Sequence, residues 1–185
     1  GLTPLGSTTD LTDNDGGTFT PSEGSGAPSC VDHETMGAGP FHAPLNSGTA
    51  LYPHAVYYAS QCVADATIAL SLDGGVTFGA SVPMFTINDC AGLHGHIKVA
   101  PDGTVYVPDK ACGGNVPLLN GGEAAVVVSE DNGLTWTIRT VPGATTTGDD
   151  DAAVGVGNDG TIYLGYQSAN GHPRIAVSHD KGVSW

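Results

Sequence analysis

Three short groups of acidic and imidazole side chains are the residues of this chain best suited to chemistry. They are Asp32, His33 and Glu34; His94 and His96; and Asp149, Asp150 and Asp151. Brought together, carboxylates could coordinate calcium, and carboxylates with imidazoles could coordinate a transition metal. The same groups could exchange protons with a substrate in general acid–base catalysis. In a third interpretation they bind no ligand and only bond nearby loop amides or face water.

The elements that must position these groups belong to a repeat. An octet of hydroxyl, acid, glycine, hydroxyl and aromatic residue occurs three times in full and once, at 12–19, in a weaker form. The full copies are Ser71, Asp73, Gly75, Thr77 and Phe78; Ser129, Asp131, Gly133, Thr135 and Trp136; and Ser178, Asp180, Gly182, Ser184 and Trp185. Aspartate bonds the amides of a turn, glycine tolerates positive φ, and the aromatic ring buries apolar area. Each octet therefore predicts a turn between antiparallel strands, with Phe78 and Trp136 buried.

The pattern S/T-x-D-x-G-x-T/S-W/F resembles the Asp-box, or BNR repeat, of sialidase-like β-propellers, over essentially the whole chain. The resemblance implies an all-β fold of four-stranded antiparallel blades. In that family the box joins the third and fourth strands, on the face opposite the active site, and is structural. About three blades' worth are present, as a single partial propeller domain over 1–185. The approximate pieces are 1–29, 30–87, 88–143 and 144–185.

A second repeated motif places the remaining strands. Asp102-Gly103 and Asp159-Gly160 each stand between apolar runs and predict the turn from a first to a second strand. The third strands are expected at 66–71, 124–129 and 174–178, and the outer strands at 77–85 and 135–141. No stretch has sustained helical periodicity, so helix should be nearly absent.

The resemblance also implies where the acidic and imidazole groups lie. First strands of a propeller line its channel, and the three groups stand at the starts of successive first strands. They are therefore expected to converge at one end of the channel, as a candidate site for a ligand or for a cation such as calcium. Sialidase activity requires three arginines, a Tyr with a Glu partner, and an Asp. This chain has only Arg139 and Arg174, and neither matches the triad, so the segment holds no complete sialidase site.

The composition of the chain restricts its possible binding partners, and its cysteines indicate its cellular location. A net charge of −14 with five Lys and Arg disfavours nucleic acid, and no apolar run is long enough for membrane insertion. The four cysteines occupy matching places around the first two strands of successive blades. We therefore predict the disulfides Cys30–Cys62 and Cys90–Cys112, with free thiols or a metal site as alternatives. Disulfides in turn indicate a secreted, extracellular protein.

Three functions remain open at this point. The first, which we favour, is a secreted, sialidase-like propeller that associates with a glycan or a cell surface. The second is a portion of an exo-sialidase or other glycoside hydrolase whose arginine triad lies outside this sequence. The third is a self-assembling extracellular structural protein. Because a partial propeller has open edges near residue 20 and beside 173–178, we expect further blades of the same polypeptide or another copy of the chain to cover them.

Overall fold

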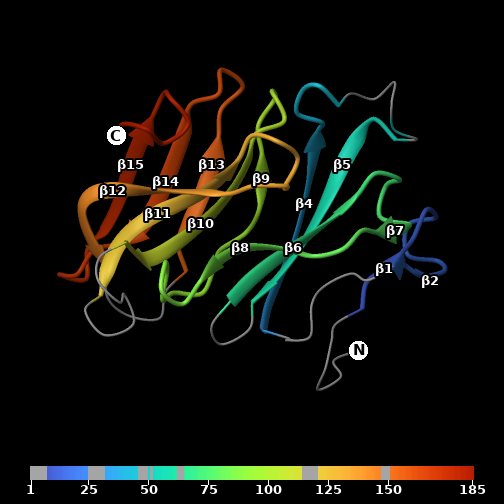
Figure 1. Cartoon of the computed structure of the whole chain (residues 1–185), viewed down its shortest axis with the longest axis horizontal. Coiled ribbons are helices and arrows are strands. Elements are labelled where there is room, and N and C mark those ends of the chain that lie inside the picture. Colours follow the sequence, from blue (N-terminus) through green and yellow to red (C-terminus); the bar gives the residue numbers. More distant parts are fainter. Residues whose placement is uncertain are drawn as a thin grey trace.

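The computed structural model describes residues 8–24, 32–45, 50, 52–61, 65–113, 121–146 and 151–185. Every regular element in these ranges is a β-strand, so the predicted all-β class is confirmed. Within the same ranges, no helix is long and apolar enough to cross a membrane. Figure 1 shows the strands gathered into three main sheets that follow one another in chain order.

Each main sheet is an antiparallel meander, in which strands adjacent in the sequence are adjacent in space. Sheet 1 contains β4 (Asp32–Pro40), β5 (His54–Gln61), β6 (Asp65–Ser71) and β8 (Val82–Thr86). Sheet 2 contains β9 (Lys98–Val99), β10 (Val105–Cys112), β11 (Gly122–Ser129) and β12 (Thr137–Thr146). Sheet 3 contains β13 (Ala153–Val156), β14 (Ile162–Gln167) and β15 (Pro173–Ser178).

Two small ladders lie beside sheet 1. Strand β1 (Asp10–Leu11) pairs with β2 (Thr20–Pro21), and β3 (Glu23–Gly24) pairs in parallel with β7 (Thr77–Phe78). The outer strand predicted at 77–85 is therefore wrong as a single element. Its first two residues leave sheet 1 to pair with β3, and only β8 pairs with β6. In sheet 2 the outer strand β12 begins at Thr137 and continues to Thr146, beyond the predicted end at residue 141.

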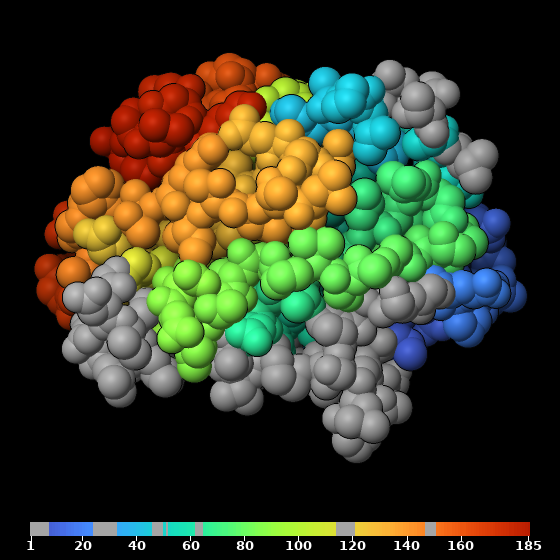
Figure 2. Space-filling view, viewed as in Figure 1, coloured from blue at the N-terminus to red at the C-terminus, as the bar shows by residue number. Residues whose placement is uncertain are grey.

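The apolar core lies between successive sheets. Side chains alternate along each strand, so sheet 2 buries both of its faces. One face, with Val105, Val107 and Val127, packs on Tyr57 and Ile68 of sheet 1. The opposite face packs on sheet 3 and contains Tyr106, Val126 and Val128, which meet Ile162 and Leu164. On the face drawn in Figure 2, β12 (orange) adjoins the segment around β8 (green), so sheets 1 and 2 also meet through their outer strands.

The first strands of the three sheets are neighbours. Strand β9 contacts β4 on one side and β13 on the other. Glycine permits this approach: a Cβ at Gly37 would lie 2.6 Å from Ile97 Cγ2, and one at Gly39 would lie 2.5 Å from the Cβ of Val99. The close approach of the first strands brings together the side chains at their starts.

All four octets form the same turn. The Ser71 hydroxyl donates to Asp73 Oδ1 and accepts from Gly75 N, both at 2.8 Å. Asp73 also accepts from Thr77 N at 2.9 Å and from the Thr77 hydroxyl at 2.6 Å. The same four bonds recur in the octets that begin at Ser129 and Ser178. In the weaker octet Asn14 replaces the aspartate, and its amide nitrogen donates to Thr18.

The aromatic residues of the octets differ in burial. Phe78 is buried against Tyr58 and Ala69, as predicted. Trp136 is only half-buried, so the prediction that it is buried was too strong, and Trp185 is likewise half-buried. The Trp136 indole Nε1 donates to Gly133 O at 3.2 Å, which holds the ring against its own turn. Phe19 of the weaker octet is mostly exposed.

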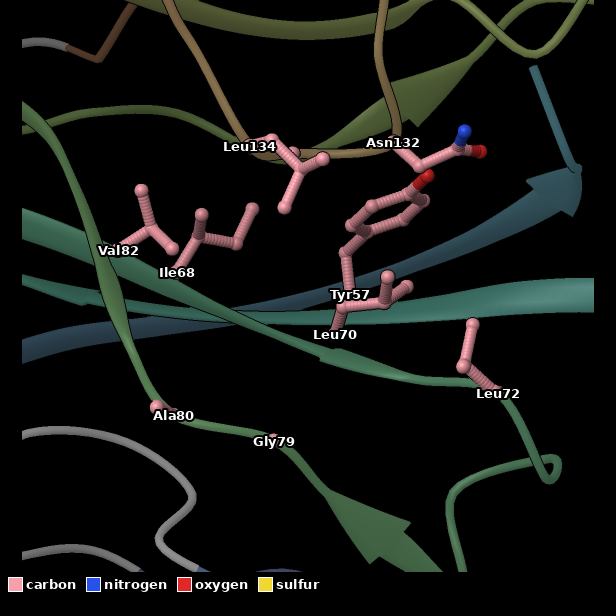
Figure 3. A pocket seen from close by; sticks show the side chains of 10 residues that line it. Tyr57, Ile68, Leu70, Leu72, Gly79, Ala80, Val82, Asn132 and Leu134 are labelled. Atoms are coloured by element: carbon pink, nitrogen blue, oxygen red, sulfur yellow. The ribbon is translucent and has the colours of Figure 1, made fainter. Parts of the chain in front are cut away.

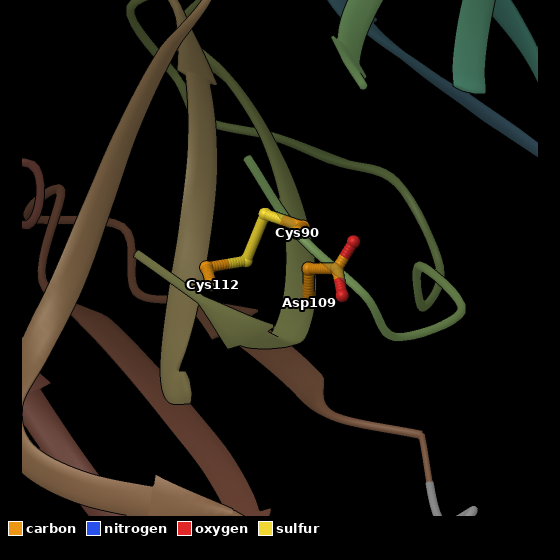
Figure 4. Close-up of side chains that lie close together, drawn as sticks. All are labelled: Cys90, Asp109 and Cys112. Carbon is orange, nitrogen blue, oxygen red and sulfur yellow. A yellow bond between two sulfur atoms is a disulfide. The ribbon is translucent and has the colours of Figure 1, made fainter. Parts of the chain in front are cut away.

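Cys90 and Cys112 form a disulfide, which is the pairing that the sequence predicts (Figure 4). The bridge ties the end of β10 to the segment that precedes β9. A disulfide is consistent with an oxidising, extracellular environment. The other predicted pair, Cys30–Cys62, lies outside the described residues.

Candidate functional site

Side chains from all three sheets meet at one end of the first strands. His33 lies near the start of β4, His94 precedes β9, and Asp151 precedes β13. The His33 Nε2 lies 3.2 Å from Oδ2 of Asp151. The His33 ring stands edge-on to the ring of His94, with centroids 5.4 Å apart and an interplanar angle of 85°. We call His33, His94 and Asp151 the sheet-start cluster.

The cluster and the octet turns lie at opposite ends of the strands. The start of β4 pairs with the end of β5, since Asp32 faces Gln61. The start of β5 pairs with the end of β6, since Val56 faces Ser71, the first residue of its octet. The end of β5 therefore lies beside His33, and the start of β5 lies beside the turn at 71–78. His33 and this turn are at opposite ends of sheet 1.

A bulge in β4 directs His33 toward its partners. The pairing register of β4 with β5 shifts between Asp32 and Thr35. His33 has a φ of 58°, a left-handed conformation that is uncommon for residues other than glycine. Bulges commonly re-aim a side chain next to a functional site, and strained backbone of this kind concentrates at such sites.

Gln61 and Gly95 position His94. The His94 amide donates to Gln61 Oε1 at 2.9 Å, and Gln61 Nε2 donates to Gly92 O at 2.8 Å. A Cβ at Gly95 would lie 2.1 Å from Ala152 O, so only glycine lets this segment approach the start of β13 so closely. The glycine between the two histidines thus brings His94 near Asp151.

His94 is a buried neutral imidazole. Burial lowers the pKa of His94 to about 4, and the nearby His33 acts in the same direction. The Nδ1 lies 3.1 Å from Gly95 O and must carry the proton, because a carbonyl oxygen only accepts. The Nε2 lone pair is buried and has no hydrogen-bond partner among the described residues. An unpaired buried acceptor is costly, so a ligand donor at this atom would be stabilising.

Asp109, in β10, is a site residue that the sequence interpretation missed. Its Oδ1 accepts from Lys110 N, whereas its buried Oδ2 has no hydrogen-bond partner among the described residues. Burial raises the pKa of Asp109 well above its ordinary value, and the charge of Asp151 adds to this rise. One feature of the sequence could have identified Asp109. It is a carboxylate in the otherwise apolar run 105–109, which belongs to a strand expected to be buried on both faces.

The other predicted site residues divide into two groups. His96 shares a 3.2 Å hydrogen bond with Thr35, and its charge contributes to the low pKa of His94. Glu34 is exposed, and within the described residues it forms no hydrogen bond or ion pair with the cluster. Asp149, Asp150 and the side chain of Asp32 lie outside the described part of the chain.

Among the described residues, His33, His94 and Asp151 do not form a group of three close metal-ligating atoms. Within the described residues, the one group of three metal-ligating side chains with ligand atoms within 4.8 Å of one another is Cys90, Asp109 and Cys112 (Figure 4). Its two sulfur atoms are bonded to each other, so they are not available as thiolate ligands.

An apolar hollow of about 250 Å³ lies between sheet 1 and the octet turn of sheet 2. In Figure 3 the side chains of Tyr57, Ile68 and Leu70 line its sheet side, and Leu134 of the turn faces them. The Tyr57 hydroxyl is buried without a hydrogen-bond partner among the described residues. The hollow offers few polar groups and is therefore a packing interface between sheets rather than a site for a polar ligand.

Within the described residues, neither arginine forms a hydrogen bond or ion pair with the cluster. Arg139, in β12, donates to Glu130 Oε1 at 2.7 Å and to Lys181 O at 2.8 Å. Arg174 is exposed on β15. Arg174 lies at the start of β15, at the same end of sheet 3 as Asp151, but it is not bonded to the cluster.

A comparison with protein-family models finds no match for this chain, and a comparison with curated proteins finds none either. The octet geometry and the sheet-start cluster are therefore the basis for any functional conclusion.

Proposed function

We propose that the chain forms successive blades of a sialidase-like Asp-box β-propeller that acts outside the cell, and that its sheet-start cluster binds an uncharged glycan. Three features support the blade arrangement: the adjacent first strands, the sheets packed face to face, and the octet turns gathered at the opposite end. The Cys90–Cys112 disulfide supports the extracellular location.

The observation that carries the ligand proposal is the unpaired Nε2 of His94, whose ring stands edge-on to His33 beside the His33–Asp151 contact. His94 Nε2 can accept a hydrogen bond, and the buried Asp109 carboxyl, whose pKa is raised, can donate one in its protonated form. Sugar hydroxyls both donate and accept, so they complement such a mixed set. His33 and Asp151 are partly exposed and are accessible to further hydroxyls.

Charge favours an uncharged ligand. The chain carries a net charge of −14, which repels anions at long range. A sialic acid carboxylate is best bound by the planar fork of arginine, and within the described residues neither arginine is bonded to the cluster. A neutral hexose or N-acetylhexosamine needs no such clamp.

Saturation-transfer NMR with galactose, N-acetylglucosamine oligomers and N-acetylneuraminic acid tests the proposal. We expect transfer to a neutral sugar, and its loss in His33→Ala. The matched control is His54→Ala, which removes an exposed imidazole at the other end of the same strand pair. Absence of transfer to every sugar, or equal transfer in the folded His33→Ala variant, would contradict the ligand assignment.

Glycoside hydrolysis is a second candidate, and the raised pKa of Asp109 favours it. A carboxylic acid that keeps its proton at neutral pH can protonate the glycosidic oxygen of a leaving group, while a second carboxylate activates water. Asp151 is the nearby carboxylate whose charge acts on Asp109. A panel of nitrophenyl glycosides tests this: turnover should disappear in Asp109→Asn. If a sugar binds but no glycoside is hydrolysed, the cluster binds glycans without catalysing their hydrolysis.

A further inference from the structure

The apolar hollow between sheets 1 and 2 is bordered by exposed leucines. Leu72 and Leu134 both line it and are 46% and 65% exposed. Figure 3 shows Leu134 of the octet turn facing Ile68 and Val82 of sheet 1 across the open space. Concave, mainly apolar surfaces with a few polar groups are the usual form of small-molecule sites. The hollow therefore has the construction of a site for an apolar ligand.

The corresponding place between sheets 2 and 3 is filled by an arginine side chain. In sheet 1 Ile68 pairs with Val82, and in sheet 2 Val126 pairs with Arg139. A Cβ at Gly182, in the turn that covers sheet 2, would lie 3.0 Å from Val126 and 3.4 Å from the Cβ of Arg139. Arg139 thus packs directly against this turn.

At the hollow, no side chain of the outer strand packs against the turn in this way. The three atoms nearest to a Cβ at Gly133 belong to Tyr57 and Trp136, at 3.4 to 3.8 Å, and none belongs to β8. Val82 occupies the position of Arg139, and its side chain is much shorter. The hollow therefore results from a small residue in sheet 1 rather than from the geometry of the octet turn.

Arg139 shows which chemistry suits this place. Its guanidinium donates to Lys181 O at 2.8 Å and to Glu130 Oε1 at 2.7 Å. At the hollow, Asn132 occupies the octet position of Lys181, and the two residues have φ angles of 62° and 61°. Leu72 occupies the position of Glu130. A molecule in the hollow therefore meets a backbone carbonyl that accepts a hydrogen bond, but an apolar side chain in place of the carboxylate.

The surroundings of the hollow disfavour a charged ligand of either sign. Burial raises the pKa of the Tyr57 phenol, and the negative charge of Asp131 adds to this rise. An anion in the hollow would meet the same charge and would lose its hydration. A cation would also lose its hydration, without the carboxylate that pairs with Arg139.

We propose that the hollow binds a small, uncharged aromatic molecule whose single N–H or O–H donates to the Asn132 carbonyl. An apolar cavity of about 150 Å³ can hold benzene, so a hollow of about 250 Å³ accommodates a bicyclic ring such as indole. The Tyr57 ring on the hollow's sheet side offers an aromatic contact. Because the hollow adjoins the octet turn, at the end of the strands opposite the sheet-start cluster, the proposal does not depend on the glycan site.

Titration with indole, followed by two-dimensional amide NMR, tests the site. The wild-type chain should show saturable shifts in the 131–136 turn and in β8. Benzofuran has the shape of indole but lacks the N–H, so it should bind about twofold to tenfold more weakly. Indole-3-acetate, an anion, and tryptamine, a cation, should also bind more weakly than indole.

A variant that fills the hollow tests its location. Val82→Arg introduces the side chain that fills the other interface and should weaken indole binding by tenfold or more. If this variant does not fold, adding Leu72→Glu supplies the carboxylate that Arg139 has in Glu130. Val183→Arg is the matched control, because Val183 is 72% exposed and does not line the hollow, and its affinity for indole should equal that of wild type.

Absence of saturable shifts in the folded wild-type chain would overturn the proposal. Undiminished affinity in a folded variant with arginine at position 82 would do the same, as would shifts confined to the sheet-start cluster. Equal affinity for indole and benzofuran would overturn the assigned hydrogen bond. Sugars are tested in separate titrations, so failure of glycan binding and failure of indole binding are distinguishable.

Discussion

The Nε2 atom of His33 lies 3.2 Å from Oδ2 of Asp151 and joins the start of sheet 1 to the start of sheet 3. Both side chains are partly exposed, so this contact adds only about 0–1 kcal/mol to stability. Its structural effect is orientation, because it holds the His33 ring edge-on to the buried His94. The contact thus links the starts of two sheets beside a buried imidazole whose pKa is lowered to about 4.

His94 should make the fold sensitive to mild acid. Its pKa of about 4 in the folded chain lies below the ordinary 6.5, so the unfolded chain binds the extra proton first. Stability should therefore fall as the pH is lowered from about 6.5 to about 4, by at most about 3 kcal/mol from this residue. Urea unfolding at pH 7 and pH 4.5 measures the difference.

His94→Gln should flatten that pH dependence, even if it lowers stability at both pH values. His54→Gln, which alters an exposed imidazole, should leave the dependence as in the wild type. An unchanged pH dependence in His94→Gln would mean that His94 protonates freely in the folded chain.

Asp109→Asn should become more favourable as the pH rises. Burial raises the pKa of Asp109, so the folded chain keeps this proton to a higher pH than the unfolded chain, which loses it above about pH 4. Native aspartate therefore destabilises the fold increasingly with rising pH, and asparagine removes this penalty. The melting temperature of Asp109→Asn relative to wild type should rise between pH 5 and pH 8, and Asp65→Asn, at an exposed position of β6, is the control. A constant difference would show that Asp109 ionises in the fold.

The octet aspartates should contribute to unfolding in strong acid. Hydrogen bonds from Ser184 and Ser178 lower the pKa of Asp180 to about 2. Burial opposes a similar shift at Asp131, but bonds from Thr135 and Ser129 outweigh it and its pKa is also lowered. A depressed pKa stabilises the fold above the unfolded value, and this contribution disappears as the pH falls through the folded value.

Stability should accordingly decrease between about pH 4 and pH 2, and Asp180→Ala should weaken this dependence. Thermal unfolding monitored by circular dichroism across that range measures it. Asp13→Ala changes an exposed carboxylate of the weaker octet and should leave the dependence intact. If Asp180→Ala has the same acid midpoint as wild type, its octet bonds do not stabilise the ionised form.

The octet aromatics should differ in their contribution to stability. Phe78→Ala removes a buried ring and should cost about 3–5 kcal/mol, whereas Trp136→Ala should cost less because the Trp136 side chain is partly exposed. Denaturant unfolding of the two variants measures the difference directly. A larger loss for Trp136→Ala would mean that its contact with sheet 1 dominates over the burial of Phe78.

The sequence by itself determined the octet turns. Their bonds connect atoms at most four residues apart, such as Gly75 N with the Ser71 hydroxyl and Thr77 N with Asp73. Local bonds of this kind depend only on residue types at fixed offsets, which is why four separate octets close alike. The meander of each sheet and the Cys90–Cys112 bridge followed from the same periodic spacing.

Only the tertiary structure decided which side chains are covered. Tyr106 and Tyr163 occupy the same place in the repeat, yet one is buried and the other exposed, because burial depends on a neighbouring sheet. Asp109 acquires its raised pKa from the packing around it, and no local pattern specifies that packing. His33, His94 and Asp151 meet because three first strands lie side by side, and contacts between residues so distant in sequence depend on how whole sheets pack.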